Sequence, residues 1–544
     1  MTTMSHAPSS AAEAIAGSPL IPGQPARAAV GQPGLTALVT TLRRLDRPVF
    51  VLRTADGVTL SNDAPDGDAE VLTAVAALDP ATLGDPDFLA AHGVRWPYMA
   101  GAMANGIAGE DLVIALARAG FLASFGAAGL LPDRISAALD RFEREIPGHP
   151  FACNLIHSPS EELLERSAVE LYLARGVRCV EASAFMDLTP HIVRYRLAGL
   201  FRDQDGNVQS ANRVIAKVSR AETATKFLSP APARIVEALL AEGLITAEQA
   251  ELSRQVPVAD DITVEADSGG HTDRRPMPAL LPSMLRLRDS LVAQYGYRTS
   301  VRIGAAGGIG TPESTLAAFA MGAAYVVTGS VNQACRESGT SDITRALLAE
   351  ASVTDCEMAP AADMFEMGVN LQVLRKGTLF PMRARRLYAV YREYAGISAI
   401  PADERAKLES QIFRADLDEV WASCQEYFSR RDPAQLERAE SDSKRQMALI
   451  FRWYLGMSSR WSNVGESDRS LDYQIWCGPA MGAFNDWARG SYLQAPERRH
   501  VADVARQLMH GAAYLARVEQ LRLAGLRLPS AVRDFRPADL AQTA

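Results

Sequence analysis

The sequence predicts an α/β protein built on a (β/α)8 TIM barrel, with a small N-terminal unit and a largely helical additional domain. Three observations carry this prediction. Short apolar segments alternate with helical segments from residue 97 onward, as parallel α/β folds require. Glycine-rich turns close the last two apolar segments, where TIM barrels commonly bind phosphate. The 544 residues exceed the roughly 250 of an ordinary barrel and leave room for further units.

Eight segments have the length and apolar content of buried strands, and a helical segment follows each of the first seven. In chain order they are Tyr98–Met103, Phe121–Phe125, Phe151–Ile156, Cys179–Ser183, Arg213–Ser219, Ile262–Asp267, Arg302–Ala306 and Tyr325–Thr328. The count matches a closed barrel. A doubly wound sheet is the alternative, but it needs a reversal of strand order that a sequence pattern does not reveal.

The remaining segments divide the chain around this barrel. We expect a disordered tail (1–34), a small α/β unit (35–93), the barrel (94–345), a helical region for substrate or carrier docking (346–500) and a C-terminal helix with a frayed tail (501–544). The first segment is rich in Ala, Pro, Ser and Gly but lacks the apolar core of a signal peptide. In the helical region the periodicity is clearest over Leu408–Phe428 and Asp432–Gly456.

Composition excludes several classes of function. The net charge of −8 argues against nucleic acid as a partner. No run of 18 apolar residues is present, so no membrane span is expected. The six cysteines are widely spaced without a C-x-x-C pair, which indicates neither a disulfide framework nor a zinc site and fits a reducing cytoplasm.

The turns after the last two strands are typical of a phosphate site. Gly307 and Gly308 follow the seventh strand, and Gly329 and Ser330 follow the eighth. Backbone N–H groups in such turns bind anions without a cation. A Rossmann turn is the rival interpretation, but it expects an acidic residue where Gly329 and Ser330 stand. An ordinary tight turn without a ligand is the other alternative.

Small residues and isolated polar groups stand at the ends of the other strands. The first strand ends near Ala102 and Met103, the third carries Asn154, and the fifth carries Lys217 in an otherwise apolar run. Gly269, Gly270 and His271 follow the sixth strand. Because strand ends of a barrel converge on one site, this set suits a flat aromatic cofactor across the barrel mouth.

Longer motifs carry a resemblance to a known family. The segments EADSGGHTDRRP (265–276), GAAGGIGTPES (304–314) and GSVNQACRESGTSD (329–342) resemble the flavin-dependent barrels of nitronate monooxygenases. They are more similar to the PfaD branch, the trans-acting enoyl reductases of polyunsaturated fatty acid and polyketide synthases. GVNLQVLRKGTLFPMRARRLYAVYREY (368–394) and IWCGPAMGAFNDWARGSYL (475–493) resemble that branch too. The resemblance spans roughly residues 51–493, and it departs at Arg274, where the branch usually has Asn.

The resemblance implies FMN as the cofactor. Gly307, Gly308, Gly329 and Ser330 would hold its phosphate. Gly269 and Gly270 would let the backbone pass close to the ribityl chain or phosphate. Ala102 and Met103 would line the ring face, and Asn154 its edge. For Met103 core packing is the alternative, and for Asn154 a backbone cap.

Two ionisable side chains need separate interpretations. Lys217 is costly in an apolar strand without a partner, which would be the flavin pyrimidine edge or a carboxylate such as Glu181 or Asp267. His271 would supply the proton for enoyl reduction or polarise the thioester carbonyl. The alternative is a histidine that only binds phosphate or caps a loop. Cys335 is expected to be an inert thiol, because enoyl reduction needs no thiol nucleophile.

The expected function is FMN-dependent enoyl-acyl carrier protein reduction, an oxidoreduction of a CH–CH bond. NADPH or NADH would be the reductant, the substrate an enoyl thioester, and the partner an acyl carrier protein of a polyketide or fatty acid synthase. The alternative is a nitronate monooxygenase, using dioxygen on small nitro compounds; a flavin-loaded scaffold protein is a third option. A homodimer is one option for assembly. Among basic residues 375–386, Arg383 and Arg385 are candidates for carrier docking; a solvated face is the alternative.

Overall fold

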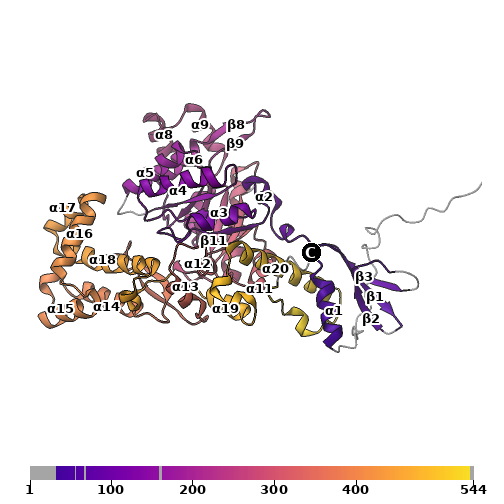
Figure 1. Cartoon of the computed structure of the whole chain (residues 1–544). Coiled ribbons are helices and arrows are strands. Elements are labelled where there is room, and N and C mark those ends of the chain that lie inside the picture. Colours follow the sequence, from indigo (N-terminus) through magenta and orange to yellow (C-terminus); the bar gives the residue numbers. More distant parts are fainter. Residues whose placement is uncertain (1–31, 56, 66–68, 158–161, 300, 539–544) are drawn as a thin grey trace, which may run out of the picture.

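A computed structural model describes residues 32–55, 57–65, 69–157, 162–299 and 301–538 (Figure 1). Most of the tail expected over residues 1–34 therefore lies outside the described residues. Within the described part of the chain, no helix has both the length and the apolar character needed to cross a membrane.

A closed barrel of eight parallel strands forms the centre of the molecule and confirms the predicted fold. Its strands are β4 (Tyr98–Ala100), β5 (Leu122–Phe125), β6 (Ala152–Ile156), β7 (Cys179–Ser183), β10 (Arg213–Val218), β11 (Asp261–Glu265), β13 (Arg302–Ala306) and β14 (Val326–Thr328). Each expected strand is present, and two have the expected bounds. The first ends three residues early, because the backbone turns at Gly101 to form part of the barrel mouth.

Helices follow the strands and cover the outside of the barrel (Figure 1). They are α3 (Glu110–Arg118), α4 (Pro132–Glu145), α5 (Glu162–Ala174), α6 (Pro190–Leu197), α7 (Ala221–Leu228), α10 (Met277–Tyr295), α11 (Pro312–Ala320), α12 (Ser330–Gln333) and α13 (Asp342–Ala349). Two insertions add a hairpin, β8 (Leu200–Arg202) and β9 (Val208–Ser210), and helices α8 (Ala233–Ala241) and α9 (Ala247–Leu252). Thr311 caps α11 through Ser314, with Pro312 at the first helical position.

A buried ion cluster closes the end of the barrel opposite the strand carboxyl ends. His92, from α2 (Pro86–His92), lies 2.8 Å from Asp261, and Arg302 makes two bonds of 2.6 and 2.9 Å to the same carboxylate. Despite burial, the charges of His92 and Arg302 lower the pKa of Asp261 to about 2. The cluster satisfies a buried carboxylate at the strand starts and leaves the other end of the barrel for a site.

A helical lobe and a small sheet lie beside the strand carboxyl ends. The lobe contains α14 (Phe380–Glu393), α15 (Ala402–Leu408), α16 (Leu417–Arg431), α17 (Ala434–Ser441) and α18 (Ser443–Val464), at the left in Figure 1. The sheet has the order β12-β16-β15, from Gly270–His271, Asn370–Leu374 and Cys356–Pro360. The sequence pattern did not predict this sheet. It joins the loop after barrel strand β11 to the start of the helical region.

The N-terminal unit packs against the C-terminal helix (Figure 1). It holds α1 (Gln32–Arg43) and the antiparallel strands β1 (Val49–Thr54), β2 (Gly57–Ser61) and β3 (Glu70–Val75). Helix α20 (Val501–Leu523) buries Arg517 against it, and α19 (Ala480–Ala488) precedes α20. Residues 528–538 do not form the frayed tail that was expected after α20, because Val532 and Phe535 are buried there.

Candidate active site

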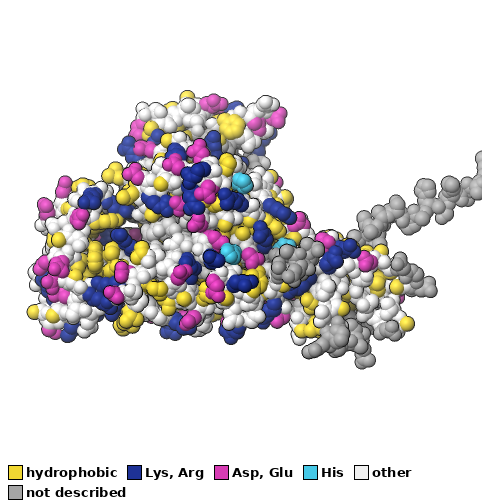
Figure 2. Space-filling view, viewed as in Figure 1, with side chains coloured by type: hydrophobic (Ala, Val, Ile, Leu, Met, Phe, Trp, Pro, Cys, Tyr) yellow, Lys and Arg dark blue, Asp and Glu magenta, His cyan; other side chains and the backbone are white. Residues whose placement is uncertain are grey.

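A cavity of about 1890 Å³ opens where the barrel strands end. Barrel loops form one wall, and α16, α18 and the segment around Trp476 form the other. The lobe side bears hydrophobic side chains toward this hollow (Figure 2). Every site residue proposed from the sequence lines the cavity, namely Ala102, Met103, Asn154, Lys217, Gly269, Gly270, His271, Gly307, Gly308, Gly329 and Ser330.

The two glycine turns present unpaired backbone donors. Within the described residues, the N–H groups of Gly307, Gly308, Gly329 and Ser330 have no hydrogen-bond partner. A Cβ at Gly308 or Gly329 would meet no atom within 4 Å, so both face open space. Gly308 has φ +72°, a left-handed conformation that favours glycine. Four free donors beside open space form a cradle for an anion.

The two glycines that follow β11, Gly269 and Gly270, differ in what surrounds them. A Cβ at Gly269 would lie 2.9 Å from the Cys477 backbone, so this glycine is required by protein packing. Gly270, with φ +81°, has no atom within 4 Å of that position and faces open space. The hydroxyl of Ser330 accepts a bond of 3.1 Å from the Gly478 N–H, which fixes the turn after β14 to the segment before α19.

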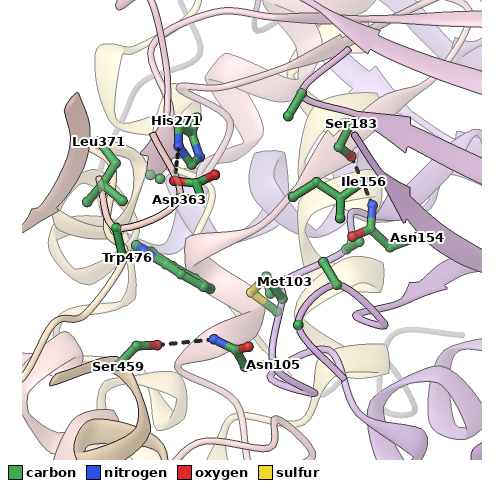
Figure 3. A pocket seen from close by; sticks show the side chains of 18 of the residues that line it. Met103, Asn105, Asn154, Ile156, Ser183, His271, Asp363, Leu371, Ser459 and Trp476 are labelled. Atoms are coloured by element: carbon green, nitrogen blue, oxygen red, sulfur yellow. Dashed lines mark hydrogen bonds and ion pairs between the residues drawn. The ribbon is translucent and has the colours of Figure 1, made fainter. Parts of the chain in front are cut away.

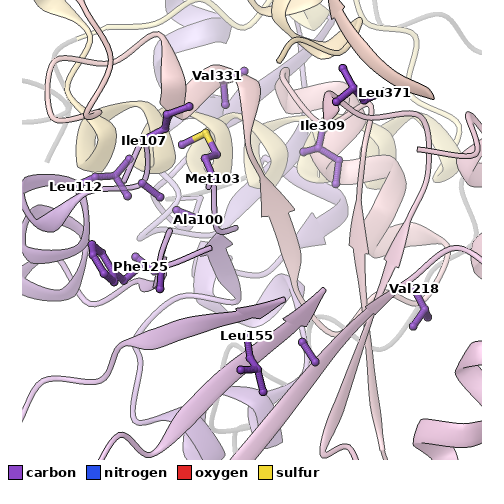
Figure 4. Close-up of a cluster of buried hydrophobic side chains, with 14 of the residues drawn as sticks. Ala100, Met103, Ile107, Leu112, Phe125, Leu155, Val218, Ile309, Val331 and Leu371 are labelled. Atoms are coloured by element: carbon purple, nitrogen blue, oxygen red, sulfur yellow. The ribbon is translucent and has the colours of Figure 1, made fainter. Parts of the chain in front are cut away.

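The first strand's turn forms part of the cavity floor. Met103 lines the cavity and also belongs to the hydrophobic core beside Ile107, so core packing is confirmed and the ring-face role stays a prediction (Figure 4). The N–H of Ala102 donates a bond of 2.7 Å to Glu181 Oε2. Glu181 is fully buried, and its Oε1 has no partner within the described residues. This carboxylate holds the turn in place beneath the cavity.

Asn154 and Lys217 have protein partners of different kinds. The Asn154 amide donates to the Glu181 backbone oxygen at 3.1 Å and to Ser183 Oγ at 3.0 Å, across adjacent strands (Figure 3). Lys217 lies 3.3 Å from Glu265, not paired with the Glu181 or Asp267 carboxylate that the sequence suggested. Although burial lowers the Lys217 pKa, the charges of Glu265 and Glu181 raise it above its usual value. Lys217 is thus a fixed cation in the cavity wall.

His271 forms a pair with Asp363, an acid that the sequence did not single out. Its Nε2 lies 3.1 Å from Asp363 Oδ1, and both side chains face the cavity (Figure 3). Burial lowers the His271 pKa, but the hydrogen bond and charge of Asp363, and the charge of Glu265, raise it above the ordinary value. The imidazole is one-third exposed. The pair favours the protonated form of the imidazole and leaves Nδ1 free of Asp363.

The pairing of β12 with β16 fixes the position of His271 at the cavity. Strand β12 pairs His271 with Leu371 and Gly270 with Gln372. The Gln372 amide donates to Asp267 Oδ1 at 2.9 Å and to the Ser268 backbone oxygen at 2.8 Å. Asp363 and Gln372 come from the helical region, about a hundred residues after His271, and carry no local motif that would have identified them.

The basic run of α14 is not a free docking patch. Arg383 is almost buried and forms an ion pair with Asp472, which is fully buried and also accepts a bond of 2.7 Å from Tyr454. Arg385 and Arg386 pair with Glu357 and Glu404. The docking hypothesis for Arg383 is therefore wrong, because its charge is used inside the lobe.

Cys335 agrees with the expectation of an inert thiol. It is fully buried and donates to the Val331 backbone oxygen at 3.3 Å. Burial raises its pKa well above the usual range, so the thiolate is disfavoured. No group of three or more ligand-type side chains suited to a metal ion occurs among the described residues.

These features fit FMN. The anion cradle would take the phosphate, and the open positions at Gly270, Gly308 and Gly329 leave room that a side chain would fill. Met103 offers an apolar surface for a ring, and Lys217 offers a cation for its electron-rich edge. The buried Oε1 of Glu181 is an acceptor without a donor at the same floor.

Comparisons with known proteins agree with this geometry. Residues 87–407 match the family model for nitronate monooxygenase, and residues 394–473 match the inserted helical domain of [acyl-carrier-protein] S-malonyltransferase. The chain is 37% identical in sequence to the enoyl reductase domain of MlnA from the macrolactin biosynthesis cluster of Bacillus amyloliquefaciens, which is known from a crystal structure. That match has a TM-score of 0.78 and covers 81% of this chain and 99% of the other.

The chain matches only part of each of two longer curated relatives. The chain is 48% identical to one of the polyunsaturated fatty acid synthase subunits of Thraustochytrium sp. over 90% of its length, but it spans only 33% of that protein. It is 43% identical to the polyketide biosynthesis protein PksE of Bacillus subtilis over 81% of its length and spans 57% of that protein. From the family model and these relatives, the chain belongs to the nitronate monooxygenase family, in its PfaD-type branch of enoyl reductases.

Proposed function

We propose that the protein is an FMN-dependent, trans-acting enoyl reductase that uses NAD(P)H. It reduces the 2,3-double bond of enoyl thioesters bound to the acyl carrier protein of a polyketide or polyunsaturated fatty acid synthase. The observation that carries the proposal is the combination in one cavity of an anion cradle and the His271–Asp363 pair. The names of the relatives, which include a fatty acid synthase component and an enoyl reductase domain, support the substrate class.

Each part of the cavity has a role in this reaction. FMN bound in this cavity would supply the hydride-transfer chemistry that couples NAD(P)H oxidation to reduction at the β-carbon of the enoyl chain. His271 donates a proton from Nδ1 to the α-carbon, while Asp363 holds the ring through Nε2. Lys217 would hold the electron-rich edge of the flavin, and the turns at Gly308 and Gly329 would hold its phosphate. Apolar side chains such as Met103 and Trp476 exclude water from the acyl chain.

The visible spectrum of the purified protein tests this proposal first. A flavin band near roughly 450 nm that NADPH bleaches without oxygen, and that a 2-enoyl thioester restores, is the expected result. If a nitronate and dioxygen restore the band but the enoyl thioester does not, the monooxygenase alternative replaces it. A protein that binds no flavin under any loading condition contradicts the assignment of the glycine turns.

A further inference from the structure

Exposed apolar side chains gather at the opening of the cavity. Leu131 precedes α4, Met186 follows β7, Tyr427 lies on α16, and Val464 ends α18. All four line the cavity, and each is at least half exposed. Single exposed hydrophobic residues are normal, but four around one opening indicate a surface that meets another molecule. We call these four residues and the exposed arginines described next the entrance rim.

The entrance rim is basic although the chain is acidic. Two exposed glutamates, Glu222 and Glu426, line the cavity. The exposed arginines that line it are more numerous and comprise Arg134, Arg220, Arg274, Arg430 and Arg460. With a net charge of −8 for the whole chain, this excess of positive charge is local. Such a patch attracts an acidic partner and orients it during approach.

Two of these arginines are free to bind a partner. Arg134, Arg220 and Arg430 form ion pairs with Glu110, Asp273 and Glu426. Arg274 and Arg460, in contrast, have no carboxylate partner within the described part of the chain. They come from opposite walls, because Arg274 follows His271 by three residues and Arg460 lies near the end of α18.

Arg274 has an unusual backbone conformation for its residue type. Its φ of +50° is left-handed, a region that favours Gly or Asn. Thr272 Oγ1 accepts its N–H at 3.0 Å, which fixes this turn beside β12. The fold therefore holds an exposed, unpaired guanidinium at the cavity next to His271, at some cost in backbone strain.

We propose that the entrance rim docks the acidic acyl carrier domain, with Arg274 and Arg460 as its charged anchors. The inference rests on the proposed function and names the surface by which that function meets its partner. A carrier domain delivers its thioester on a short arm, so it must contact the protein where the cavity opens. Arginines bind both the carboxylates of such a domain and the phosphate of its arm, and the apolar residues match the core of a protein interface.

Charge reversal at the two anchors tests the proposal. The variants are Arg274→Glu, Arg460→Glu and the double variant. Arg385→Glu is the matched control, because it is an exposed arginine of the lobe that does not line the cavity. Each flavin-loaded protein is assayed with an enoyl thioester on a phosphopantetheinylated carrier domain and with the same enoyl group on pantetheine. The double variant should raise KM for the carrier substrate at least about tenfold more than KM for the pantetheine substrate.

Direct binding separates this proposal from the proposed function. A fluorophore-labelled carrier domain is titrated with each protein at low and high salt. We expect the double variant to weaken binding about tenfold at low salt, and Arg385→Glu to leave it unchanged. Equal binding by wild type and double variant, or equal loss on both substrates, overturns the docking surface. If the wild type reduces neither thioester, the proposed function fails, and the titration alone decides whether the rim binds the carrier.

Discussion

His271 and Asp363 show how a single contact between distant residues sets the chemistry of a site. A free histidine has a pKa near 6.5 and loses its proton close to neutrality. Asp363 holds the imidazole at 3.1 Å and favours its charged form, which is the form that can donate a proton. The same carboxylate fixes the ring so that Nδ1 is the available nitrogen.

Substitution of the histidine tests its place in the reaction. His271→Ala removes the proton donor but no part of the anion cradle, so kcat should fall by about two to four orders of magnitude. The flavin content, measured by absorbance after gel filtration, should stay within about twofold of wild type. A flavin-loaded variant with full activity would remove His271 from catalysis.

Substitution of the acid tests its role as a positioning residue. The imidazolium is present below the folded pKa and is lost as pH rises through it. Asp363→Asn removes the charge that raises this pKa and leaves burial, which lowers it. The basic limb of the kcat profile should therefore move to lower pH. Asp355→Asn, at a carboxylate outside the cavity, is the control. An unmoved limb in Asp363→Asn would mean that the pair does not control the proton donor.

At the scale of elements, the loop after β14 is a place where cofactor binding can be tested separately from protein packing. Gly329 has a negative φ of −131°, outside the left-handed region that favours glycine, and its Cβ position is empty. Gly329→Val should therefore still fold, with a loss of stability on the order of 1 kcal/mol in the melting curve of the flavin-free protein. The added side chain fills the anion cradle, so the Kd for FMN should rise at least about a hundredfold.

A second glycine of the cavity provides the control for this loop. Gly456 lies on α18 in the opposite wall and also has an empty Cβ position. Gly456→Val should bind FMN as wild type does, which fluorescence quenching of the flavin measures. Equal weakening by both variants would place the phosphate elsewhere in the cavity.

The barrel was predictable from sequence because its strands are buried on both faces. Such strands form short continuous apolar runs, and the seventh, Arg302–Ala306, has the expected bounds. The glycine turns were equally visible, because φ values such as +72° at Gly308 favour glycine. Local signals of this kind do not depend on the rest of the fold.

The contact partners that only the tertiary structure brings together were not predictable from the sequence. Lys217 required a carboxylate, but the sequence did not single out Glu265, which stands on the neighbouring strand of the closed barrel. Asp363 reaches His271 only because β12 pairs with β16 across about a hundred residues of sequence. Arg383 had the composition of a surface patch, whereas its burial depends on Asp472 in a later turn. Each of these contacts is long-range, and no spacing rule encodes it.

At the scale of the whole molecule, one arginine fastens the two ends of the chain together. Arg517 is fully buried on α20, and its guanidinium donates to five backbone oxygens of the N-terminal unit. These acceptors are Leu42, Arg44, Leu45, Arg47 and Ala76, at 2.8 to 3.3 Å. The planar fork of arginine can serve many acceptors at once, which an ammonium group cannot.

Arg517→Lys should therefore loosen the N-terminal unit without disturbing the site. A lysine retains the charge but has fewer donors on a single nitrogen, so several buried oxygens lose their partners. We expect docking of the unit to weaken by about 3 kcal/mol, which is roughly a hundredfold in the population of the open form. Limited proteolysis between residues 76 and 85 should accelerate by a similar factor, while the flavin spectrum and turnover remain those of wild type. Arg522→Lys, at an exposed arginine of the same helix, should be cleaved at the wild-type rate. Because the site lies at the far side of the barrel from this contact, loss of flavin in Arg517→Lys would show that the two ends of the chain support the barrel itself.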